Sequence, residues 1–270
     1  MGNISKREWI IGIAVAFIVT AIAIITYQPI QTKMIGDIKQ YEQSLKIDNN
    51  SDQFIYAIET NVGDVLSYGK FLSLQPQSIP ELIGEYSIIE KVTEEYTMHI
   101  DLVCTTDGDG NQSCHTETSY SWDYDGSEYF KTNQYEFLGY IFLDSEIQGL
   151  NLFRRNMNEN NIALEYVDRL KGNYIYKENK RGTSVGDIRY RYDVLPTEFS
   201  GSLFARFFND KISNPMAEKK RLYIEYEKTI DEVLENKRKN LGIFNVVYYV
   251  LFILIGIGIY LVIAYHKLDL

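Results

Sequence analysis

The chain has few of the residues from which reactive sites are built. Its 270 residues include two cysteines and three histidines. His266 follows the last apolar run, and the other two histidines fall on one predicted solvent face, too far apart to share a ligand. No zincin helix, P-loop or dinucleotide-binding pattern occurs. We therefore expect a protein that is not an enzyme, with no catalytic residue, no metal ion and no cofactor.

Basic residues are also scarce. Lys and Arg number 27 against 37 Asp and Glu, and the formal net charge is −10. Nucleic-acid binding depends on Lys and Arg that neutralise phosphates, so this balance argues against such a partner. The acidic surplus is concentrated between Glu81 and Phe130, a stretch with a single basic residue, Lys91. A surface of this charge attracts cations or a basic partner, or simply keeps the domain soluble.

Long apolar runs are present at both ends of the chain. The run 241–265 has no charged side chain, and a second run begins at Ile10. About 20 residues, each rising about 1.5 Å, suffice to cross the ~30 Å hydrocarbon core of a bilayer. We therefore predict transmembrane helices at 10–27 and 241–265, with the lipid bilayer as a partner.

Loop charges predict the topology. Lys6 and Arg7 favour a cytoplasmic tail at 1–9, so an uncleaved first span sends the central domain outside and returns the tail at 266–270 to the cytoplasm. The basic triplet 237–239, on the domain side of the second span, opposes this orientation. The first span usually dominates, and long domains largely escape the charge rule. We expect a multi-pass protein of the cell membrane with its central domain outside the cytoplasm.

The central region, 28–240, is predicted to be one β-rich domain, which makes the fold class α+β. Patterns with a period near two predict strands at 54–58, 65–74, 85–92, 96–104, 135–142, 173–177, 187–194 and 199–208. Two helical segments are expected at its edges. Pro29 should interrupt the first helix before a short amphipathic stalk at 33–45.

A stalk helix at 215–240 is predicted at the other edge of the domain. Asn214 is a suitable N-cap, and Pro215 suits the first helical position. Apolar residues then recur at helical spacing up to Asn240. We expect this helix to continue into the second span as one rod, roughly 75 Å long at helical rise.

The clearest element is a hairpin of 96–104 and 114–124. Pairing Cys104 with Cys114 sets the register of an antiparallel ladder. Alternation then puts the apolar side chains and both cysteines on one face, and the polar side chains with two histidines on the other. We expect the first face to be buried as core and the second to meet water.

Three states of the two cysteines are considered. A disulfide between Cys104 and Cys114 is favoured, and two free buried thiols are the alternative. Zinc is disfavoured because His99 and His115 point to the opposite face. A disulfide persists only in an oxidising compartment, in agreement with an external domain. The turn between the cysteines resembles a calcium loop in its first ligand positions, but it lacks the glycine and the glutamate that such a loop requires.

The candidate binding surface lies along this hairpin. It combines one tryptophan with carboxylates, namely Trp122, Asp123, Asp125, Glu117 and Glu94. Carboxylate pairs beside an aromatic platform also suit glycan hydrolysis, in which two carboxyl groups act on one glycosidic bond. Such pairs arise freely in a chain this acidic, so the hydrolase is the lesser alternative.

Several short motifs carry a family resemblance that covers most of the chain. They are Gly84-Glu85-Tyr86, Glu94-Glu95-Tyr96, Ser119 to Tyr124, Phe137-Leu138-Gly139, Gly186 to Tyr192 and Phe199-Ser200-Gly201. Together they resemble uncharacterised two-span membrane proteins of Gram-positive bacteria and their phages. More remotely, the chain is similar to LUMA-type transmembrane proteins and to the membrane-adjacent domain of mitochondrial membrane-anchored ubiquitin ligases. The resemblance implies the two-span architecture, and it implies no ligase activity because RING cysteines are missing.

These observations together predict an integral membrane protein with a non-enzymatic binding or scaffold domain in a cell-envelope complex. The partner would be another envelope protein or a second copy of the chain. Two alternatives are an envelope hydrolase acting on glycan and a homo-oligomeric membrane assembly protein.

Overall fold

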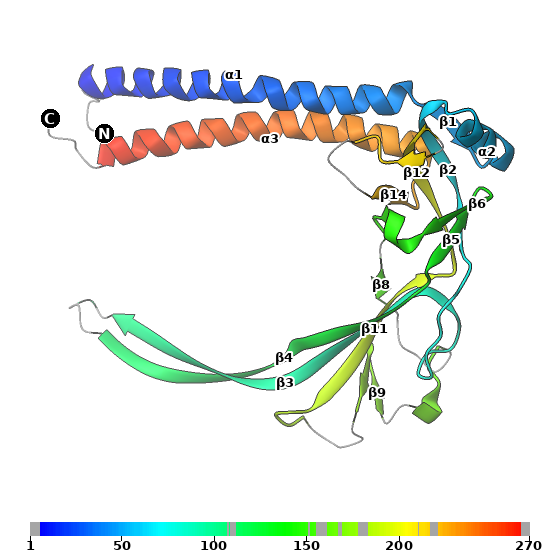
Figure 1. Ribbon diagram of the computed structural model, residues 1–270. Helices are drawn as coiled ribbons and strands as arrows, with labels where there is room; N and C mark the ends of the chain where they lie inside the picture. Colours follow the sequence, from blue (N-terminus) through cyan, green and yellow to red (C-terminus); the bar gives the residue numbers. More distant parts are fainter. Residues whose placement is uncertain are drawn as a thin grey trace.

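The structure is a computed structural model that describes residues 6–106, 108, 112–150, 152–154, 161–166, 169–177, 183–209, 211–216 and 221–265. Its described part contains three α-helices and two β-sheets. The helices from the two ends of the chain, α1 and α3, lie side by side, and the β-rich domain lies at one end of the pair (Figure 1). The predicted α+β class with terminal apolar helices is confirmed.

Both terminal helices are long and apolar enough to cross a membrane. α1 spans Lys6–Gln43 and includes the predicted stalk at 33–43, whereas Leu45 already begins a strand. The interruption expected at Pro29 is wrong, because α1 continues through it. Proline removes one N–H donor from the helix, and a helix can bend past that loss where the turn is exposed, as it is here.

The end of α1 is stabilised by a lysine. The Lys46 ammonium donates hydrogen bonds to the backbone carbonyl and to the hydroxyl of Ser44, both at 2.8 Å, and to the carbonyl of Tyr41. The last carbonyls of a helix have no partner within it, and a cation is favourable at this end of the helix dipole. Burial lowers the pKa of this ammonium group. Lys46 therefore fixes the point at which the helix turns into the domain.

The predicted stalk helix at 215–240 is wrong in its first half. Leu222–Tyr226 forms a strand, β14, and α3 spans Ile230–Tyr265. Thr229 and Glu232 make the N-terminal cap, since the Glu232 carboxylate accepts from the Thr229 backbone N–H at 2.8 Å and the Thr229 hydroxyl accepts from the Glu232 N–H at 3.4 Å. Asn214 instead donates a side-chain hydrogen bond to the carbonyl of Arg221 at 2.6 Å. The continuous helix is thus roughly 54 Å long at about 1.5 Å per residue.

An eight-stranded sheet forms the part of the domain next to the helices. Its strand order is β6-β5-β2-β12-β14-β7, while β1 pairs with β2 and β13 pairs with β12. The bounds are β1 Leu45–Asp48, β2 Gly63–Ser73, β5 Gln134–Phe137, β6 Tyr140–Leu143, β7 Ile147–Gln148, β12 Glu198–Phe208 and β13 Lys211–Ser213, with a short 3-10 turn at Asp144–Glu146. The predicted strand at 135–142 is in fact the hairpin of β5 and β6.

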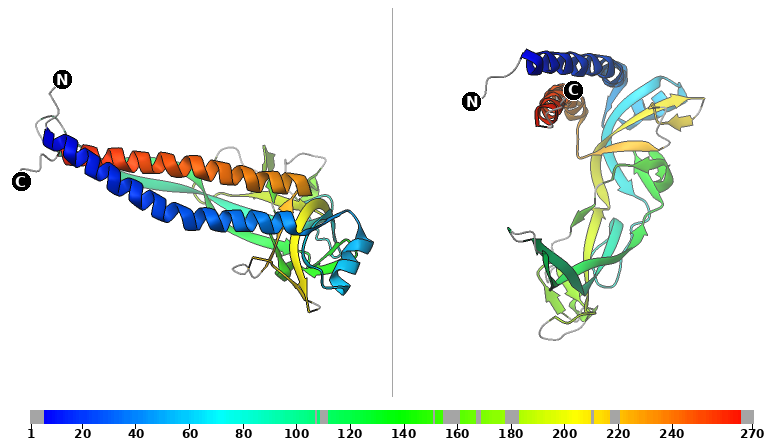
Figure 2. Two further views of the ribbon diagram at one scale, coloured as in Figure 1. Left: turned by 90° about the horizontal axis from the view of Figure 1, so that it is seen from above. Right: turned by 90° about the vertical axis from the view of Figure 1, so that its left-hand side faces the viewer.

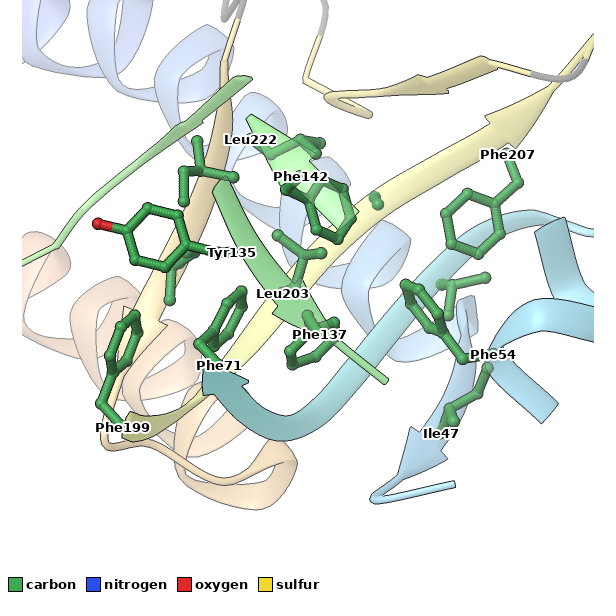
Figure 3. Packing of buried hydrophobic residues seen from close by; sticks show 14 of the residues in the cluster. Ile47, Phe54, Phe71, Tyr135, Phe137, Phe142, Phe199, Leu203, Phe207 and Leu222 are labelled. Carbon is green, nitrogen blue, oxygen red and sulfur yellow. The ribbon is translucent and has the colours of Figure 1, made fainter. Parts of the chain in front are cut away.

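Aromatic rings fill the core of this sheet (Figure 3). Phe54 meets Phe137 and Phe207 edge-on, with ring centroids 5.4 Å apart in both pairs. Phe54 comes from a helix, α2 Ser51–Glu59, so the strand predicted at 54–58 is wrong. The cap explains the error, because the Asn50 side chain accepts a hydrogen bond from the backbone N–H of Gln53 at 3.0 Å and thereby starts the helix.

A six-stranded sheet lies further from the helices. Its order is β4-β3-β11-β10-β9, with β8 paired to β11. The bounds are β3 Tyr86–Thr106, β4 Gln112–Lys131, β8 Phe153–Arg154, β9 Arg169–Lys171, β10 Tyr174–Tyr176 and β11 Ile188–Pro196, with a second 3-10 turn at Leu164–Tyr166. Cys104 pairs with Cys114 in the ladder, which confirms the predicted register. The predicted strands at 85–92 and 96–104 are one strand, β3, with a register shift between Thr93 and Glu94.

The outer half of the β3–β4 hairpin leaves the sheet and forms an arm, which we define as residues 97–106 and 112–121. The pairing of β11 with β3 ends at Ile188 opposite Glu95. Beyond this point the arm runs back in the same general direction as α1 and α3, well separated from them (Figures 1 and 2). The arm is therefore a projection rather than a part of either core.

The apolar face of the arm is exposed, so the expectation that it forms core is wrong. Ile100, Leu102 and Tyr120 on this face are 61%, 70% and 52% exposed. Buried residues of the six-stranded sheet, such as Ile89 and Tyr192, lie where β3 pairs with β11. Alternation predicts one buried face and one solvent-exposed face, but the hairpin projects from the sheet and both of its faces are uncovered.

A disulfide joins Cys104 and Cys114 near the tip of the arm. Because the arm lies outside both cores, the cross-link should stabilise the arm alone by local closure of a short loop. We expect the double variant Cys104→Ser/Cys114→Ser to speed amide hydrogen exchange in the arm and to leave the melting midpoint of the domain within about 2 °C of the wild-type value. A fall of about 8 °C or more would show that the arm is part of the global folding unit.

The helices meet the eight-stranded sheet at a junction formed by Tyr41, Leu66, Phe204 and Val233, all of them buried. The ring of Tyr41 on α1 stacks on that of Phe204 on β12, with centroids 3.9 Å apart. Ion pairs surround this contact. Arg238 on α3 donates to the Glu42 carboxylate on α1 at 2.7 Å. The apolar packing and the ion pair together tie both helices to the sheet.

Glu225 on β14 provides the other ionic contact of the junction. Its side chain is 11% exposed and accepts from Lys228 at 2.7 Å and from Lys237 at 2.8 Å. Burial raises the pKa of this carboxyl, but the two lysine hydrogen bonds outweigh burial and hold the pKa below its ordinary value. Since the pKa is depressed, the stability that Glu225 contributes is present at neutral pH and is lost as the pH falls through the folded-state pKa.

We accordingly expect Glu225→Gln to lower the free energy of unfolding by about 1–3 kcal/mol at pH 7. The difference from wild type should begin to shrink as the pH falls below about 4.3, the ordinary pKa of glutamate, where the carboxyl of the unfolded state takes up a proton first. It should be lost only below the lower folded-state pKa, where the carboxyl is protonated in both states. Thermal melts from pH 3 to pH 8 measure this effect, with Glu235→Gln, an exposed position on α3, as the control. A difference that does not vary with pH would contradict the ionic account.

Candidate functional site

An arginine–aromatic cluster lies where the arm joins the sheet. The Arg189 guanidinium lies between two rings, 3.7 Å from the centroid of Tyr174 and 4.3 Å from that of Trp122. Its nitrogens donate to the Glu94 carboxylate at 2.5 and 2.7 Å. Trp122 also meets Tyr176 edge-on at 5.6 Å. Four strands thus converge on one charged and aromatic cluster.

This arrangement follows from the register of the sheet. Arg189 lies opposite Glu94 in the β11–β3 ladder and opposite Tyr176 in the β10–β11 ladder, so the three side chains share one face. A planar guanidinium can pair with a carboxylate in the plane and stack on rings above and below it. Arg189 and Glu94 are 15% and 14% exposed, so this ion pair is largely shielded from water.

Glu94 contacts two arginines in this cluster. A second guanidinium, that of Arg191, lies 3.4 Å from the other Glu94 oxygen and also pairs with Asp193. A carboxyl group that acts as a general acid in glycan hydrolysis needs a raised pKa and a second carboxyl group across the substrate. The position of Glu94 between two guanidinium groups favours anchoring of the arm over acid catalysis.

The structure separates the other residues of the predicted binding surface. Trp122 and Glu94 share the cluster, as expected for neighbours on one face. Glu117 lies on the opposite face of the arm and pairs with His115 at 3.0 Å. Asp123 is also on that face, and exposed Asp125 lies at the register shift of β3 and β4. Of the five predicted residues, therefore, two are brought together.

A second polar cluster on that opposite face was missed by the sequence reasoning. The His99 imidazole Nε2 lies 2.7 Å from Asp123 Oδ2 and 2.9 Å from Ser121 Oγ, and the Ser121 hydroxyl donates to Asp123 Oδ1 at 2.7 Å. Hydrogen bonds from Thr97 and Ser121 lower the pKa of Asp123. The predicted ladder could have revealed this cluster, since alternation on the two paired strands places these residues on one face.

This Ser–His–Asp grouping does not have the geometry of a hydrolytic triad. In a triad one ring nitrogen receives the serine proton while the other donates to the aspartate. Here the same nitrogen of His99 contacts both residues, and Ser121 bonds directly to the aspartate. The side chains of His99 and Asp123 are also 42% and 39% exposed. The cluster is a solvent-exposed hydrogen-bond network at the base of the arm.

One hydrolase-like pattern occurs in the sequence although no nucleophilic serine was expected. Residues 182–186 read G-x-S-x-G, with Ser184 at the centre. In the hydrolase motif this serine lies on a sharp turn between a strand and a helix. Ser184 instead lies in the loop before β11, and its backbone N–H donates to the Asp187 carboxylate at 2.8 Å. The structural context of a nucleophile elbow is therefore missing.

Among the described residues, no three His, Cys, Asp or Glu side chains are grouped so that they would hold a metal ion. The chain matches no protein-family model, and no characterised protein or solved structure is significantly similar to it. The physical features of the arm and of the helices therefore carry the functional argument.

Proposed function

We propose that this chain is a two-span membrane protein whose central domain lies outside the cytoplasm and serves as a non-enzymatic binding or scaffold module in a cell-envelope complex. The arm is the part of the domain that meets the partner. The observation that carries the proposal is the exposure of the arm's apolar face, because contiguous apolar surface on a soluble domain marks an interaction site. Leu102 and Ile100 on neighbouring positions of this face are 70% and 61% exposed.

The backbone and the charge of the arm support the same role. β4 is an edge strand among the described strands, and an exposed edge can accept a strand from another protein. The arm and its tip, 97–121, contain Asp101, Asp107, Asp109 and Glu117 and no Lys or Arg. A partner with basic residues flanking an apolar segment would complement both features. The Arg189 cluster at the root would hold the arm in a fixed direction for this contact.

The contacts of the basic triplet 237–239 support the external orientation of the domain. Lys237 pairs with Glu225 and Arg238 pairs with Glu42, so two of the three positive charges that oppose this orientation have acidic partners within the domain and its stalk. The disulfide of the arm agrees with an oxidising compartment. These contacts, together with the positive tail before the first span, favour the orientation with both tails in the cytoplasm.

Site-specific photo-crosslinking in living cells tests the proposal. A photoreactive amino acid at Ile100, on the apolar face of the arm, should give a discrete adduct with another protein chain or with a second copy of this one. The matched control is Ile141 on β6, which is 50% exposed on the other sheet. Adducts at Ile100 and none at Ile141 are expected. No protein adduct at Ile100, or equal adducts at both positions, would contradict a binding role for the arm.

A further inference from the structure

The arm has two open edges. β3 pairs with β11 as far as Glu95, and the last backbone hydrogen bonds on that side join Tyr96 to Gly186 and Asp187. In the part of the chain that the structure describes, residues 97–106 pair only with β4, and β4 pairs only with β3. Natural edge strands are commonly protected by lysine or proline, and the two strands of the arm contain neither. Both edges are therefore available to another strand.

The backbone groups at these edges belong to the even-numbered residues of the arm. Tyr96 directs its N–H and its carbonyl away from β4, since they bond to Asp187 and Gly186 at 2.9 Å. The antiparallel ladder alternates, so the even-numbered residues of β3 and their partners in β4 all direct these groups outward. The Cα atoms of Cys104 and Cys114 are 4.0 Å apart, close to the ~4.5 Å of pairs that exchange no hydrogen bond. The outward-bonding residues are thus those of the apolar face.

The direction of the arm decides which edges of two copies can meet. Copies anchored in one membrane have parallel helices, and each arm runs in the general direction of its own helices (Figures 1 and 2). Neighbouring arms are then parallel too, so β3 of one copy and β4 of the next form an antiparallel ladder with their apolar faces on the same side. Two parallel arms could meet β3 to β3 only if one were turned over, which would place apolar beside polar faces.

Charge selects the register of this ladder. Within one copy Asp101 lies opposite Glu117, and a neighbour at the same height would place a second Glu117 beside Asp101. A stagger of two residues instead places His99 opposite Glu117 of the neighbouring copy and Asp101 opposite its His115. An imidazole and a carboxylate are favourable cross-strand partners, whereas two carboxylates repel each other. A stagger of one residue is excluded because the outward backbone groups would not meet.

The geometry points to a ring of identical chains, in which the β3 edge of each arm pairs with the β4 edge of the next. This inference rests on the proposed function, in which the arm meets a partner, and it identifies that partner as a second copy of this chain. A foreign strand would cover one edge and leave the other open, whereas a closed ring covers both. In water the apolar faces turn inward, and side chains fill a barrel of about eight strands, which corresponds to about four arms.

Cysteine cross-linking of the full-length protein in its membrane tests the ring. The inferred register places Thr97 of one copy opposite Ser119 of the next, in a pair with Cα atoms ~4.5 Å apart, which a disulfide can bridge. Two differently tagged chains, one with Thr97→Cys and the other with Ser119→Cys, should give a disulfide-linked product that carries both tags. Each variant expressed alone is the matched control and should give no linked product, because neither position faces its own copy.

The absence of the mixed product, or an equal yield from either variant alone, would overturn the ring. The mass of the wild-type protein in mild detergent provides a second measurement that needs no substitution. It should correspond to three or more copies, and a monomer or a dimer would contradict a closed ring. Photo-crosslinking at Ile100 separates the two proposals. An adduct with a different protein, without the Thr97–Ser119 disulfide, would overturn the ring alone, whereas no protein adduct at all would contradict the binding role of the arm as well.

Discussion

Replacing Tyr41 by alanine should lower the free energy of unfolding of the domain by about 3–5 kcal/mol, the cost typical of removing a buried aromatic ring. Tyr41 is 7% exposed and stacks on Phe204 at 3.9 Å, and the Lys237 ammonium lies 5.1 Å from its centroid. The substitution would leave a cavity between the sheet and the two helices. These elements are close-packed, which limits how far the cavity can collapse. The loss should therefore approach the upper part of this range.

The measurement is a thermal melt of the full chain in detergent, followed by near-ultraviolet circular dichroism. A domain of this size loses about 2–4 °C for each kcal/mol, so a fall of about 8 °C or more is expected. Tyr56→Ala is the matched control, because Tyr56 on α2 is 64% exposed. That control should change the stability by about 0.5 kcal/mol or less. Similar effects of the two substitutions would mean that the helices do not pack on the sheet at this junction.

Arg189→Met should destabilise the domain by about 3–5 kcal/mol, because it leaves the Glu94 carboxylate in a shielded site with its closest cation removed. The loss of stacking on Trp122 and Tyr174 adds to this effect. The arm should also lose its fixed direction, since the cluster connects the arm to β10 and β11. Thermal melts measure the first consequence, and the intrinsic fluorescence of Trp122, recorded with Trp9 replaced by phenylalanine, measures the second.

An exposed ion pair in the same protein provides the control for Arg189. Lys70 and Glu198 lie 2.6 Å apart with side chains 66% and 52% exposed, so Lys70→Met should cost about 1 kcal/mol or less. A double variant, Arg189→Met with Glu94→Leu, should recover much of the lost stability because no buried charge is left alone. Failure of the double variant to recover stability would show that stacking, rather than charge, holds the root of the arm.

Local patterns predicted those parts of the fold that local interactions determine. The two apolar runs appear as the two long helices, and the alternation around Cys104 and Cys114 gave the correct ladder register. Alternation alone also placed Glu117 and Asp123 on the face opposite Trp122, which is where the structure has them. These features depend on neighbouring residues along one strand or helix, so a single sequence contains the necessary information.

The errors occurred where a distant partner decides the local structure. Leu222, Tyr226 and Ile230 have helical spacing, but Leu222, Ile224 and Tyr226 also alternate, and pairing with β12 made that stretch a strand. The exposed face of the arm was predicted as core because alternation shows that two faces differ and not what covers them. The Arg189 cluster joins β3 to β11 across more than ninety residues, beyond the reach of a local pattern.

Labelling of the two cysteines in intact cells tests the central claim, that the helices cross a membrane and place the arm outside the cytoplasm. Cys104 and Cys114 are the only cysteines in the sequence, and they form a disulfide with each other. The account predicts that a membrane-impermeant maleimide labels the protein in intact cells only after treatment with an impermeant reductant. Labelling that requires cell lysis, with or without reductant, would place the arm in the cytoplasm and contradict the account.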